Sequence, residues 1–415
     1  MTLRVELLII GDELLNGTIL ERNGAWFGRQ LATRGIQVAY RRTVPDTITA
    51  IVDAMAQASM RADLVVTSGG LGPTVDDLTA QAAAQFLQEP VVTHEDALRS
   101  IEARRSAIGR TLTDADKKQA ELPESARVLA NPVGTAPGFS ITSNEAQFFH
   151  LPGVPHEFRE LSSKYVLPAV DAKQPSSFKS HTWKCFGVTE SGLATMVESL
   201  DSADIELHYR AHFPEIHLTA ISDNPRRLKH FRQAFESLAG RRIFGGADDH
   251  FPRVVVQGLQ RLGWSVGVAE SCTGGLVAKL ITDSPGASKV FGAGFITYAN
   301  TAKTKWLGVS DETLIQHGAV SKETVTAMAT GVRKVTGATL GIATSGIAGP
   351  GGGTTEKKVG SIHIALASEE RIRHRFLQLP FDRERNRIAT AYGALELIRK
   401  HCLEATTSNV ETNVG

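Results

Sequence analysis

A serine between an apolar run and a pair of glycines is the first candidate for chemistry. Residues 264–268 are mostly apolar, as in a short buried strand, and apolar side chains recur at helical spacing from Leu276 onward. Ser271 is therefore predicted in a strand-to-helix turn, where its hydroxyl is exposed and N–H groups of the first helical turn point at a ligand. The alternative is a glycine-rich connection in which Ser271 or Thr273 caps the helix.

A lysine further along the chain is the second candidate. Residues 295–299 have the β-branched and aromatic content of a strand, and they lead to Lys303, which lies 303 − 271 = 32 residues after Ser271. This separation is about one strand–helix–strand unit, so two strand ends could bring the side chains together. A lysine of lowered pKa that takes a serine proton is a known solution to amide hydrolysis. The alternative is a solvated surface lysine.

Composition limits the class of protein. The 415 residues suffice for two or three domains, and 42% hydrophobic with 21% charged residues is typical of a globular protein. A net charge of +1 lacks the excess of positive charge that is typical of nucleic-acid-binding proteins. Three widely spaced cysteines offer neither a disulfide framework nor metal-ligand spacing, which fits a reducing compartment. The apolar run at residues 5–10 is too short for a membrane span or signal peptide, so we expect a cytoplasmic protein without membrane or nucleic-acid partners.

Residues 1–170 alternate strand and helix patterns, which predicts an α/β domain with a mostly parallel sheet. Two polar turns, at residues 11–13 and 69–77, follow predicted strands, and ligands of such sheets bind beyond the carboxyl ends of strands. Glycines in the second turn allow close approach to a phosphate or pterin, and the aspartates can hold a hard cation. The candidate site comprises Asp12, Asp46, Gly69, Gly70, Asp76 and Asp77, with Asp12 and Asp76 as metal ligands. For Asp77, capping of the following helix is an equal alternative.

Residues 174–250 form a predicted small α+β domain after a linker at 171–177. Strands are expected at 183–188 and 215–221, and helices at 193–200 and 228–238. The region has no phosphate-clamping Gly-x-x-Gly loop, so the sequence does not support nucleic-acid binding. We expect a structural role in packing or dimer formation.

Residues 251–404 form the third predicted domain, with a second glycine-rich loop at 344–353. Ser345 in this loop could bind a substrate amide or phosphate, or it is a simple turn residue. Arg383 and Arg387 are four residues apart, so both point to one face of the last helix and could grip a phosphate. The alternative is a solvated pair. The polar tail at 405–415 is predicted to be disordered.

Six motifs follow one another in this third domain: Ala269–Gly275, Pro285–Ser288, Tyr298–Asn300, Leu307–Val309, His317–Ser321 and Ser345–Pro350. In type and order they resemble the CinA family, whose C-terminal domain is a nicotinamide mononucleotide deamidase. The resemblance implies cofactor-free hydrolysis of nicotinamide mononucleotide to nicotinate mononucleotide and ammonia, with Ser271 as nucleophile and Lys303 as base. It implies substrate contacts from Thr273, Gly274, Gly275, Ser288, Tyr298, Asn300, Ser345, Gly346, Arg383 and Arg387.

The N-terminal motifs resemble the molybdopterin-binding fold of the same family. They are Gly11–Leu15, Ser68–Thr79, Gly134–Gly138 and Leu151–Pro155. Some family members hydrolyse ADP-ribose in this domain with a divalent metal of the Mg or Co type, and a fold shared by proteins of different function transfers activity less safely than architecture. Residues 174–250 resemble the family's KH-like linker domain, although Thr189 replaces a glycine of its pattern. The resemblance thus implies an α/β–α+β–α/β chain, ADP-ribose as a second substrate and a homodimer.

Three alternatives stay open. Cys272 is intrinsically a better nucleophile than its neighbour, but no histidine lies within the motif to activate it. The chain could be a non-catalytic nucleotide-sensing or competence-associated module. It could also be mainly a nucleotide pyrophosphatase whose C-terminal domain is secondary.

Overall fold

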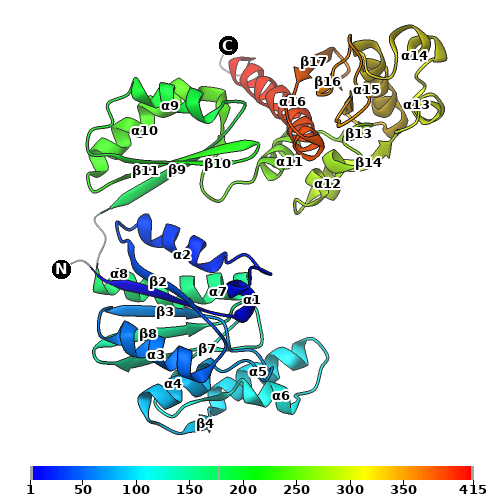
Figure 1. The fold of residues 1–415 in the computed structure, drawn as a ribbon. Coiled ribbons are helices and arrows are strands. Elements are labelled where there is room, and N and C mark those ends of the chain that lie inside the picture. The colour runs from blue at the N-terminus through cyan, green and yellow to red at the C-terminus, as the bar shows by residue number, and fades with distance from the viewer. Residues whose placement is uncertain (1–2, 175–177, 413–415) are drawn as a thin grey trace. The chain divides into compact units, whose positions relative to one another are not determined.

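The computed structural model describes residues 3–174 and 178–412, with side chains described as far as residue 406. The chain forms two compact units (Figure 1). The first comprises Met1–Ser180, Ala203–Glu206 and Ile221–His230, and the second comprises His181–Ser202, Leu207–Ala220 and Phe231–Gly415. The finer division at residues 170, 250 and 404 stays a prediction. No helix among the described residues is long and apolar enough to cross a membrane.

The first unit is built on a six-stranded sheet in the order β2-β1-β3-β8-β7-β6. The first four strands are parallel and the last two are antiparallel to their neighbours. The mostly parallel sheet is therefore confirmed. The strands are β1 (Val5–Ile10), β2 (Val38–Val44), β3 (Leu64–Ser68), β6 (Arg127–Leu129), β7 (Gly138–Ser143) and β8 (Ala146–Leu151). A separate pair consists of β4 (Val91–Thr93) and β5 (Glu121–Pro123).

Helices cover both faces of this sheet because successive strand residues point to opposite sides. Leu8 and Val65 belong to one core cluster, with α3 (Ile48–Ser59) and α4 (Thr79–Leu87). Leu7 and Val66 belong to the other, with the helices on the opposite face. Those helices are α2 (Asn23–Ala32), α7 (Pro155–Leu161) and α8 (Leu167–Lys173), the last two joined by η1 (Ser162–Val166). The remaining helices are α1 (Asp12–Leu15), α5 (Glu95–Ala107) and α6 (Asp114–Lys118).

A four-stranded sheet in the order β10-β11-β9-β12 follows in the chain. Its elements are β9 (Lys179–Phe186), α9 (Glu190–Glu198), β10 (Glu206–His212), β11 (Glu215–Ser222), α10 (Pro225–Ala239), η2 (Gly240–Arg242) and β12 (Ile243–Gly245). The strands and helices expected between residues 183 and 238 are present within a few residues of their predicted bounds. Its KH-like character stays a prediction.

The C-terminal sheet has the order β14-β13-β15-β16-β17. The first three strands are parallel and the last two are antiparallel. The strands are β13 (Val266–Glu270), β14 (Phe291–Ile296), β15 (Leu340–Gly346), β16 (Ser361–Ala367) and β17 (Ile372–Gln378). The carboxyl ends of β13, β14 and β15 consequently meet at one edge.

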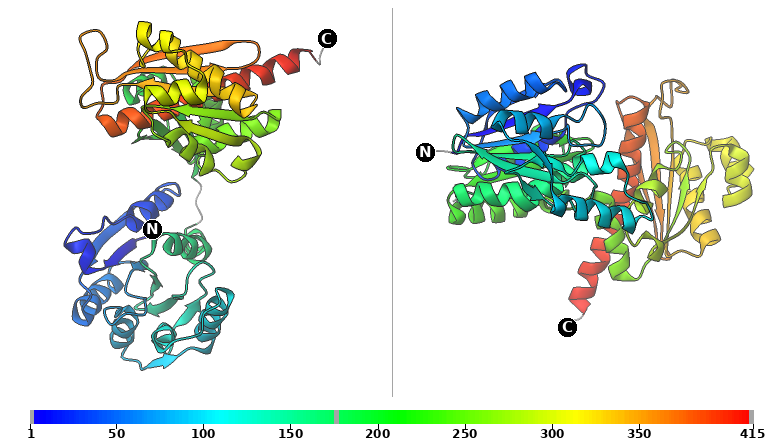
Figure 2. Two further views of the ribbon diagram at one scale, coloured as in Figure 1. Left: turned by 90° about the vertical axis from the view of Figure 1, so that its right-hand side faces the viewer. Right: turned by 90° about the horizontal axis from the view of Figure 1, so that it is seen from below.

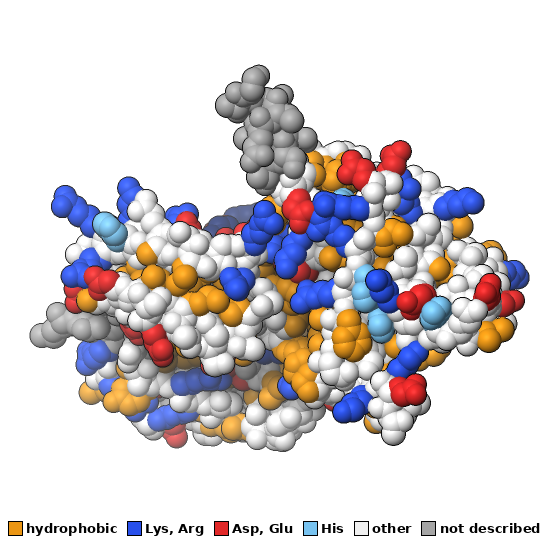
Figure 3. Space-filling view, turned by 90° about the horizontal axis from the view of Figure 1, so that it is seen from above, with side chains coloured by type: hydrophobic (Ala, Val, Ile, Leu, Met, Phe, Trp, Pro, Cys, Tyr) orange, Lys and Arg blue, Asp and Glu red, His pale blue; other side chains and the backbone are white. Residues whose placement is uncertain are grey.

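Two helical layers enclose this sheet, and Figure 2 shows α16 in red on one face and the yellow helices on the other. The first layer contains α11 (Phe251–Leu262), α12 (Leu276–Thr282) and α16 (Arg383–Thr412). The second contains α13 (Asn300–Leu307), α14 (Asp311–His317) and α15 (Lys322–Thr336), and η3 (Ala287–Lys289) precedes β14. The face drawn in Figure 3 carries Lys and Arg beside Asp and Glu, as the net charge of +1 leads one to expect.

The C-terminal tail differs from its prediction. Helix α16 continues to Thr412, so the expectation of disorder for residues 405–415 is wrong for 405–412; residues 413–415 lie outside the described part. Just before this tail, Glu404 pairs with Arg371 and Arg373 of the β16–β17 hairpin. The polar composition of the tail gave no sign of these ion pairs. These pairs hold the helix where its apolar face ends.

Candidate active site

Ser271 directly follows the carboxyl end of β13, as the sequence predicted. Its N–H donates to the Thr344 carbonyl at the end of β15, over 3.0 Å. Gly274 and Gly275 have φ of 58° and 94°, the left-handed region that glycine adopts most readily. A side chain at Gly275 would also meet the Ile296 side chain at 3.1 Å. The strand-to-helix turn is thus fixed by its neighbouring strands and by two glycines.

Lys303 reaches this turn from α13, and its Nζ lies 3.4 Å from the Ser271 Oγ. Strand β14 pairs with β13 so that Ile296 is opposite Glu270, and the chain then turns into α13. The lysine side chain is only 1% exposed, and burial lowers the pKa of Lys303 because it disfavours the ammonium form. The structure therefore brings the two predicted residues together in a setting that favours a neutral amine.

The Lys303 Nζ has three hydrogen-bonding partners, the Ser271 hydroxyl and two backbone carbonyls. The Nζ donates to the carbonyl oxygens of Thr297 at 2.8 Å and Tyr298 at 3.2 Å. A neutral amine has two N–H groups and one lone pair, so these two carbonyls can use both donors. The lone pair then remains for the Ser271 hydroxyl proton. This arrangement can deprotonate a serine during nucleophilic attack.

Glu270 occupies most of the helix N-terminus, which the sequence reasoning had assigned to a ligand. Its buried carboxylate accepts hydrogen bonds from the N–H groups of Gly275, Val277 and Ala278 at 2.9–3.1 Å. A carboxylate is stabilised there by the free N–H groups and the helix dipole. The expectation of free N–H groups along the first turn of α12 is therefore wrong. Glu270 was missed because it reads as a polar residue ending a strand.

The N–H groups of Cys272 and Thr273 are the donors of this turn that stay available within the described chain. Those of Gly274 and Leu276 donate to carbonyl oxygens inside the turn, at 3.2 and 3.3 Å. Two adjacent N–H groups beside a nucleophile are the donor arrangement of an oxyanion hole. Oxyanion donors in this turn are therefore the N–H groups of Cys272 and Thr273.

The alternative nucleophile, Cys272, is disfavoured. Its thiol is buried, and this burial raises the pKa of Cys272 to about 12. A thiol that stays protonated is a weak nucleophile. Thr273 is also buried, and its Oγ1 lies 2.7 Å from the Thr344 Oγ1. The Thr273 hydroxyl therefore bonds across the sheet edge instead of facing a substrate.

Ser345 and Gly346 lie at the end of β15, beside the Ser271 turn. Ser345 is 1% exposed, and its hydroxyl donates to the Ala319 carbonyl over 2.6 Å. Ser345 thus fixes the loop before α15, and its hydroxyl is not free for a substrate. Gly346 is required because a Cβ there would lie 2.3 Å from the Ile362 side chain.

Both predicted arginines reach the loops around Ser271. Arg387 donates to the Thr273 carbonyl at 2.8 Å. Arg383 donates to the Gly349 carbonyl at 2.6 Å and to the Tyr298 Oη at 3.2 Å. Tyr298 is 60% exposed, so this phenol lies at the surface of the site. The structure therefore brings Arg383, Arg387 and Tyr298 to the loops that surround the Ser–Lys pair.

Two predicted contacts lie elsewhere. Ser288 is exposed in η3, before the amino end of β14, whereas Ser271 follows the carboxyl end of β13. Because β13 and β14 are parallel, Ser288 lies about 15 Å away at the opposite edge of the sheet. Its assignment to this site is wrong within this chain. Asn300 is exposed at the first residue of α13, on the correct edge.

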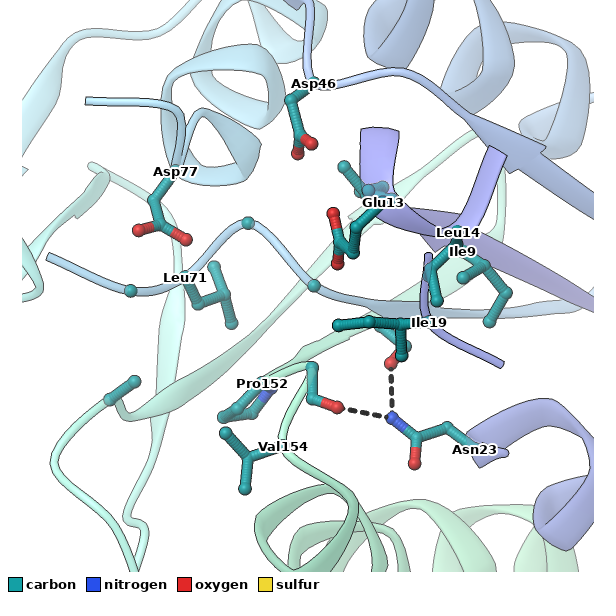
Figure 4. Close-up of a pocket in the computed structure, with 18 of the residues that line it drawn as sticks. Ile9, Glu13, Leu14, Ile19, Asn23, Asp46, Leu71, Asp77, Pro152 and Val154 are labelled. Atoms are coloured by element: carbon teal, nitrogen blue, oxygen red, sulfur yellow. Dashed lines mark hydrogen bonds between the residues drawn. The ribbon is translucent and has the colours of Figure 1, made fainter. Parts of the chain in front are cut away.

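The first unit contains a pocket of about 800 Å³ lined by both predicted polar turns (Figure 4). Gly69 and Gly70 have φ of 113° and 69°. A Cβ at Gly69 would lie 2.2 Å from the Ile10 carbonyl oxygen, and one at Gly70 would lie 2.2 Å from the Thr79 Oγ1. These glycines therefore allow the loop to pass close to β1 and α4.

Carboxylates surround this pocket, and Figure 4 shows Glu13, Asp46 and Asp77 projecting into it. Asp46 accepts the Asp12 N–H at 2.8 Å; burial raises the pKa of Asp46, and the nearby charges of Glu13, Asp12 and Asp77 add to this. Asp77 accepts from the N–H and hydroxyl of Thr74, so it is a loop-fixing residue. Exposed Asp76 also lines the pocket.

The predicted metal ligands do not form a compact donor set. Within the described residues, no three of these N-terminal carboxylates have oxygens within 4.8 Å of one another. Asp12 and Asp76 would thus need further ligands from a substrate or water. The sequence reasoning missed Glu13 and Asn23, which donates to the Ser68 Oγ at 2.9 Å and the Gly153 carbonyl at 2.8 Å. Glu13 belongs to the first polar turn, which was the available signal, whereas Asn23 begins α2 and had none.

Comparisons with known proteins agree with this architecture. Residues 248–402 match the CinA C-terminal domain, and residues 6–172 match a family described as a probable molybdopterin binding domain. A CinA-like protein of Anaeromyxobacter sp. (strain Fw109-5) is 39% identical over 96% of this chain and 99% of its own length. A CinA-like protein from Citrifermentans bemidjiense is 36% identical over 98% of this chain and 99% of its own length.

One solved structure that is similar to part of this chain is competence/damage inducible protein CihA from Agrobacterium tumefaciens. The match is 41% identical, covers 36% of this chain and 91% of the CihA chain, and has a TM-score of 0.35. Identity across nearly the whole length of the relatives, with both domain families matched in order, is decisive. The chain therefore belongs to the CinA family, with an N-terminal molybdopterin-binding-like domain and a C-terminal CinA domain.

Proposed function

We propose that the C-terminal site hydrolyses the carboxamide of nicotinamide mononucleotide to nicotinate mononucleotide and ammonia. The observation that carries the proposal is the buried Lys303 Nζ, which lies 3.4 Å from the Ser271 Oγ and also bonds to the carbonyls of Thr297 and Tyr298. Its substrate class follows from the family resemblance and from the two arginines at the site.

The mechanism proceeds in two balanced halves. The Ser271 Oγ attacks the carboxamide carbon while its proton passes to the Lys303 Nζ, and the N–H groups of Cys272 and Thr273 bind the oxyanion. Lys303 then protonates the departing nitrogen, which leaves as ammonia, and an acyl-serine remains. Water attacks this ester, again with Lys303 as base, and the carboxylic acid is released while Ser271 regains its proton.

Positive charge accounts for recognition of a mononucleotide. Arg383 and Arg387 each use part of their donors on loop carbonyls and the Tyr298 hydroxyl, and a guanidinium has five N–H groups in all. Further donors can bind phosphate oxygens in a bidentate manner. The exposed phenol of Tyr298 provides a flat surface beside them for a pyridine or ribose ring.

An ammonia-release assay on nicotinamide mononucleotide tests the proposal. The full chain should release ammonia with and without chelator, because the proposed groups are a serine, a lysine and backbone donors. Ser271→Ala is the matched negative control. No ammonia from the wild-type chain would favour the non-catalytic nucleotide-sensing alternative, and complete loss in chelator, restored by metal, would overturn the metal-free mechanism.

The N-terminal pocket favours a second activity, metal-dependent hydrolysis of ADP-ribose. Its volume suits a nucleotide, and its glycine turn can approach a diphosphate. Its carboxylates supply no positive charge, so a divalent cation must accompany the substrate. Release of AMP from ADP-ribose with Mg²⁺ or Co²⁺, and none in chelator, is the expected result; no metal-dependent hydrolysis would leave this pocket a binding site.

A further inference from the structure

The β10–β11 hairpin gathers three metal-ligand side chains outside both sites. His212 ends β10 and Glu215 begins β11, on either side of the turn residues Phe213 and Pro214. His217 lies two residues after Glu215, so both side chains project from the same face of β11. One ligand atom from each of His212, Glu215 and His217 lies within 4.8 Å of the others. All three belong to the second compact unit.

The side chains are arranged around a common point. The imidazole rings of His212 and His217 stack at 5.4 Å between centroids and 18° between planes. The His217 Nε2 lies 2.8 Å from the Glu215 carboxylate. The exposures differ, because Glu215 is 5% exposed whereas His212 is exposed at the rim. The cluster is therefore buried at Glu215 and open at His212, and an ion can enter from the open side.

The buried carboxylate of Glu215 faces two side chains. The His217 Nε2 lies 2.8 Å from it, and the Tyr392 side chain of α16 lies beside it. A carboxylate removed from water is costly unless positive charge accompanies it. A divalent cation held by this carboxylate and the two imidazoles would supply that charge.

We propose that His212, Glu215 and His217 bind a zinc ion, with water as the fourth ligand. Two imidazoles and one carboxylate are a recognised zinc ligand set. Hard cations such as Mg²⁺ prefer all-oxygen ligands, so they fit this set poorly. The proposal does not depend on the deamidase or on the N-terminal pocket.

The position of the cluster indicates a structural role. Phe213, between the ligands, packs edge-on against Phe381, with ring centroids 5.0 Å apart. The Arg385 guanidinium lies over the Phe213 ring at 5.6 Å. Phe381 lies two residues before α16, the helix that carries Arg383 and Arg387. A zinc ion would thus brace the hairpin against the first turn of that helix.

Calorimetric titration of the metal-free full chain with Zn²⁺ tests the site. His212→Ala combined with His217→Ala should remove one zinc equivalent. His230→Ala, at an exposed histidine of α10, is the matched control and should bind as the wild type does. The absorption of bound Co²⁺ should show tetrahedral geometry in the wild type and the control alone.

Folding is separated from binding by Glu215→Gln, which preserves the shape of the side chain. It should keep the metal-free circular dichroism spectrum yet lose the rise in Tm that zinc gives the wild type. Mg²⁺ should not compete with zinc for the site. Equal zinc stoichiometry in the wild type and the double histidine variant would overturn the proposal, as would a wild-type chain whose Tm zinc does not raise.

Discussion

The two candidate sites share one position in their folds but differ in where charge resides. Each lies at the carboxyl ends of parallel strands, next to a glycine-containing turn. In the C-terminal site, Glu270 occupies the helix N-terminus and a buried lysine faces the nucleophile. In the N-terminal pocket, carboxylates line the cavity and are not compactly clustered. Under the proposed functions, the first site would act by proton transfer alone, whereas the second would require a divalent cation.

The largest expected effect is loss of the Ser–Lys pair. Ser271→Ala and Lys303→Ala should each reduce ammonia release on the order of 10³-fold or more, and the double variant should be little worse, because the two groups act as a unit. Lys303→Arg should fail as well, since a guanidinium does not give up its proton. Steady-state ammonia production measures this.

A matched control for that pair is the neighbouring thiol. Cys272→Ala should retain most activity, because the buried thiol stays protonated. High activity in Ser271→Ala together with inactivation by Cys272→Ala would move the nucleophile to Cys272 and break the contrast drawn here.

The second effect concerns the arginines. Arg383→Ala or Arg387→Ala should raise KM for nicotinamide mononucleotide by roughly 10–100-fold, because charge-assisted hydrogen bonds to a phosphate are lost. Activity on the unphosphorylated riboside should change little. Arg385→Ala, on the same helix but directed to Phe213, is the control. Equal losses on both substrates would make the arginine structural.

The third separates the two sites directly. Asp46→Asn keeps an oxygen for the Asp12 N–H but removes charge from the pocket. We expect metal-dependent ADP-ribose hydrolysis to fall by roughly tenfold or more, with unchanged ammonia release. Product analysis of both reactions on one preparation measures it. A parallel fall in ammonia release would show that the sites are not independent.

The sequence predicted the parts of this molecule that depend on strong local patterns. The turn at Ser271 is framed by an apolar strand, a helical repeat and two glycines, all visible in the chain. The strand before Lys303 was expected at 295–299, but β14 spans Phe291–Ile296. Gly292 and Gly294 weaken the strand pattern in the first half of β14, so the start of this strand was not predicted. For this reason Ser288 was not recognised as preceding the strand.

Tertiary partners could not be predicted in this way. Glu270 caps a helix that begins six residues later, and Ser345 bonds to Ala319, 26 residues away. Neither bond leaves a local pattern. The proposed zinc-binding cluster did leave one: His212 and Glu215 flank a two-residue turn, and His217 follows at strand spacing. A hairpin reading of residues 206–222 would have placed the three side chains together.

The smallest expected effect is a pH dependence of stability that belongs to Lys303 alone. Burial lowers its pKa in the folded state, so the unfolded chain binds more protons at this residue between the lowered pKa and its ordinary value of 10.5. The free energy of unfolding should therefore rise with pH in that window, by at most about 1.4 kcal/mol per pH unit. Below this pH window, Lys303 is protonated in both the folded and the unfolded chain, and the folded protein is destabilised by the full free energy of burying the ammonium.

Lys303→Met isolates this contribution, because methionine fills much of the same space without a charge. Urea unfolding of both proteins from about pH 6 to about pH 10 should show the difference in stability changing in favour of the wild type as pH rises. Lys305→Met, on the exposed side of α13, should give a difference that does not vary with pH. A constant difference for Lys303→Met as well would mean that Lys303 stays charged in the folded protein, and Ser271 would then lack its base.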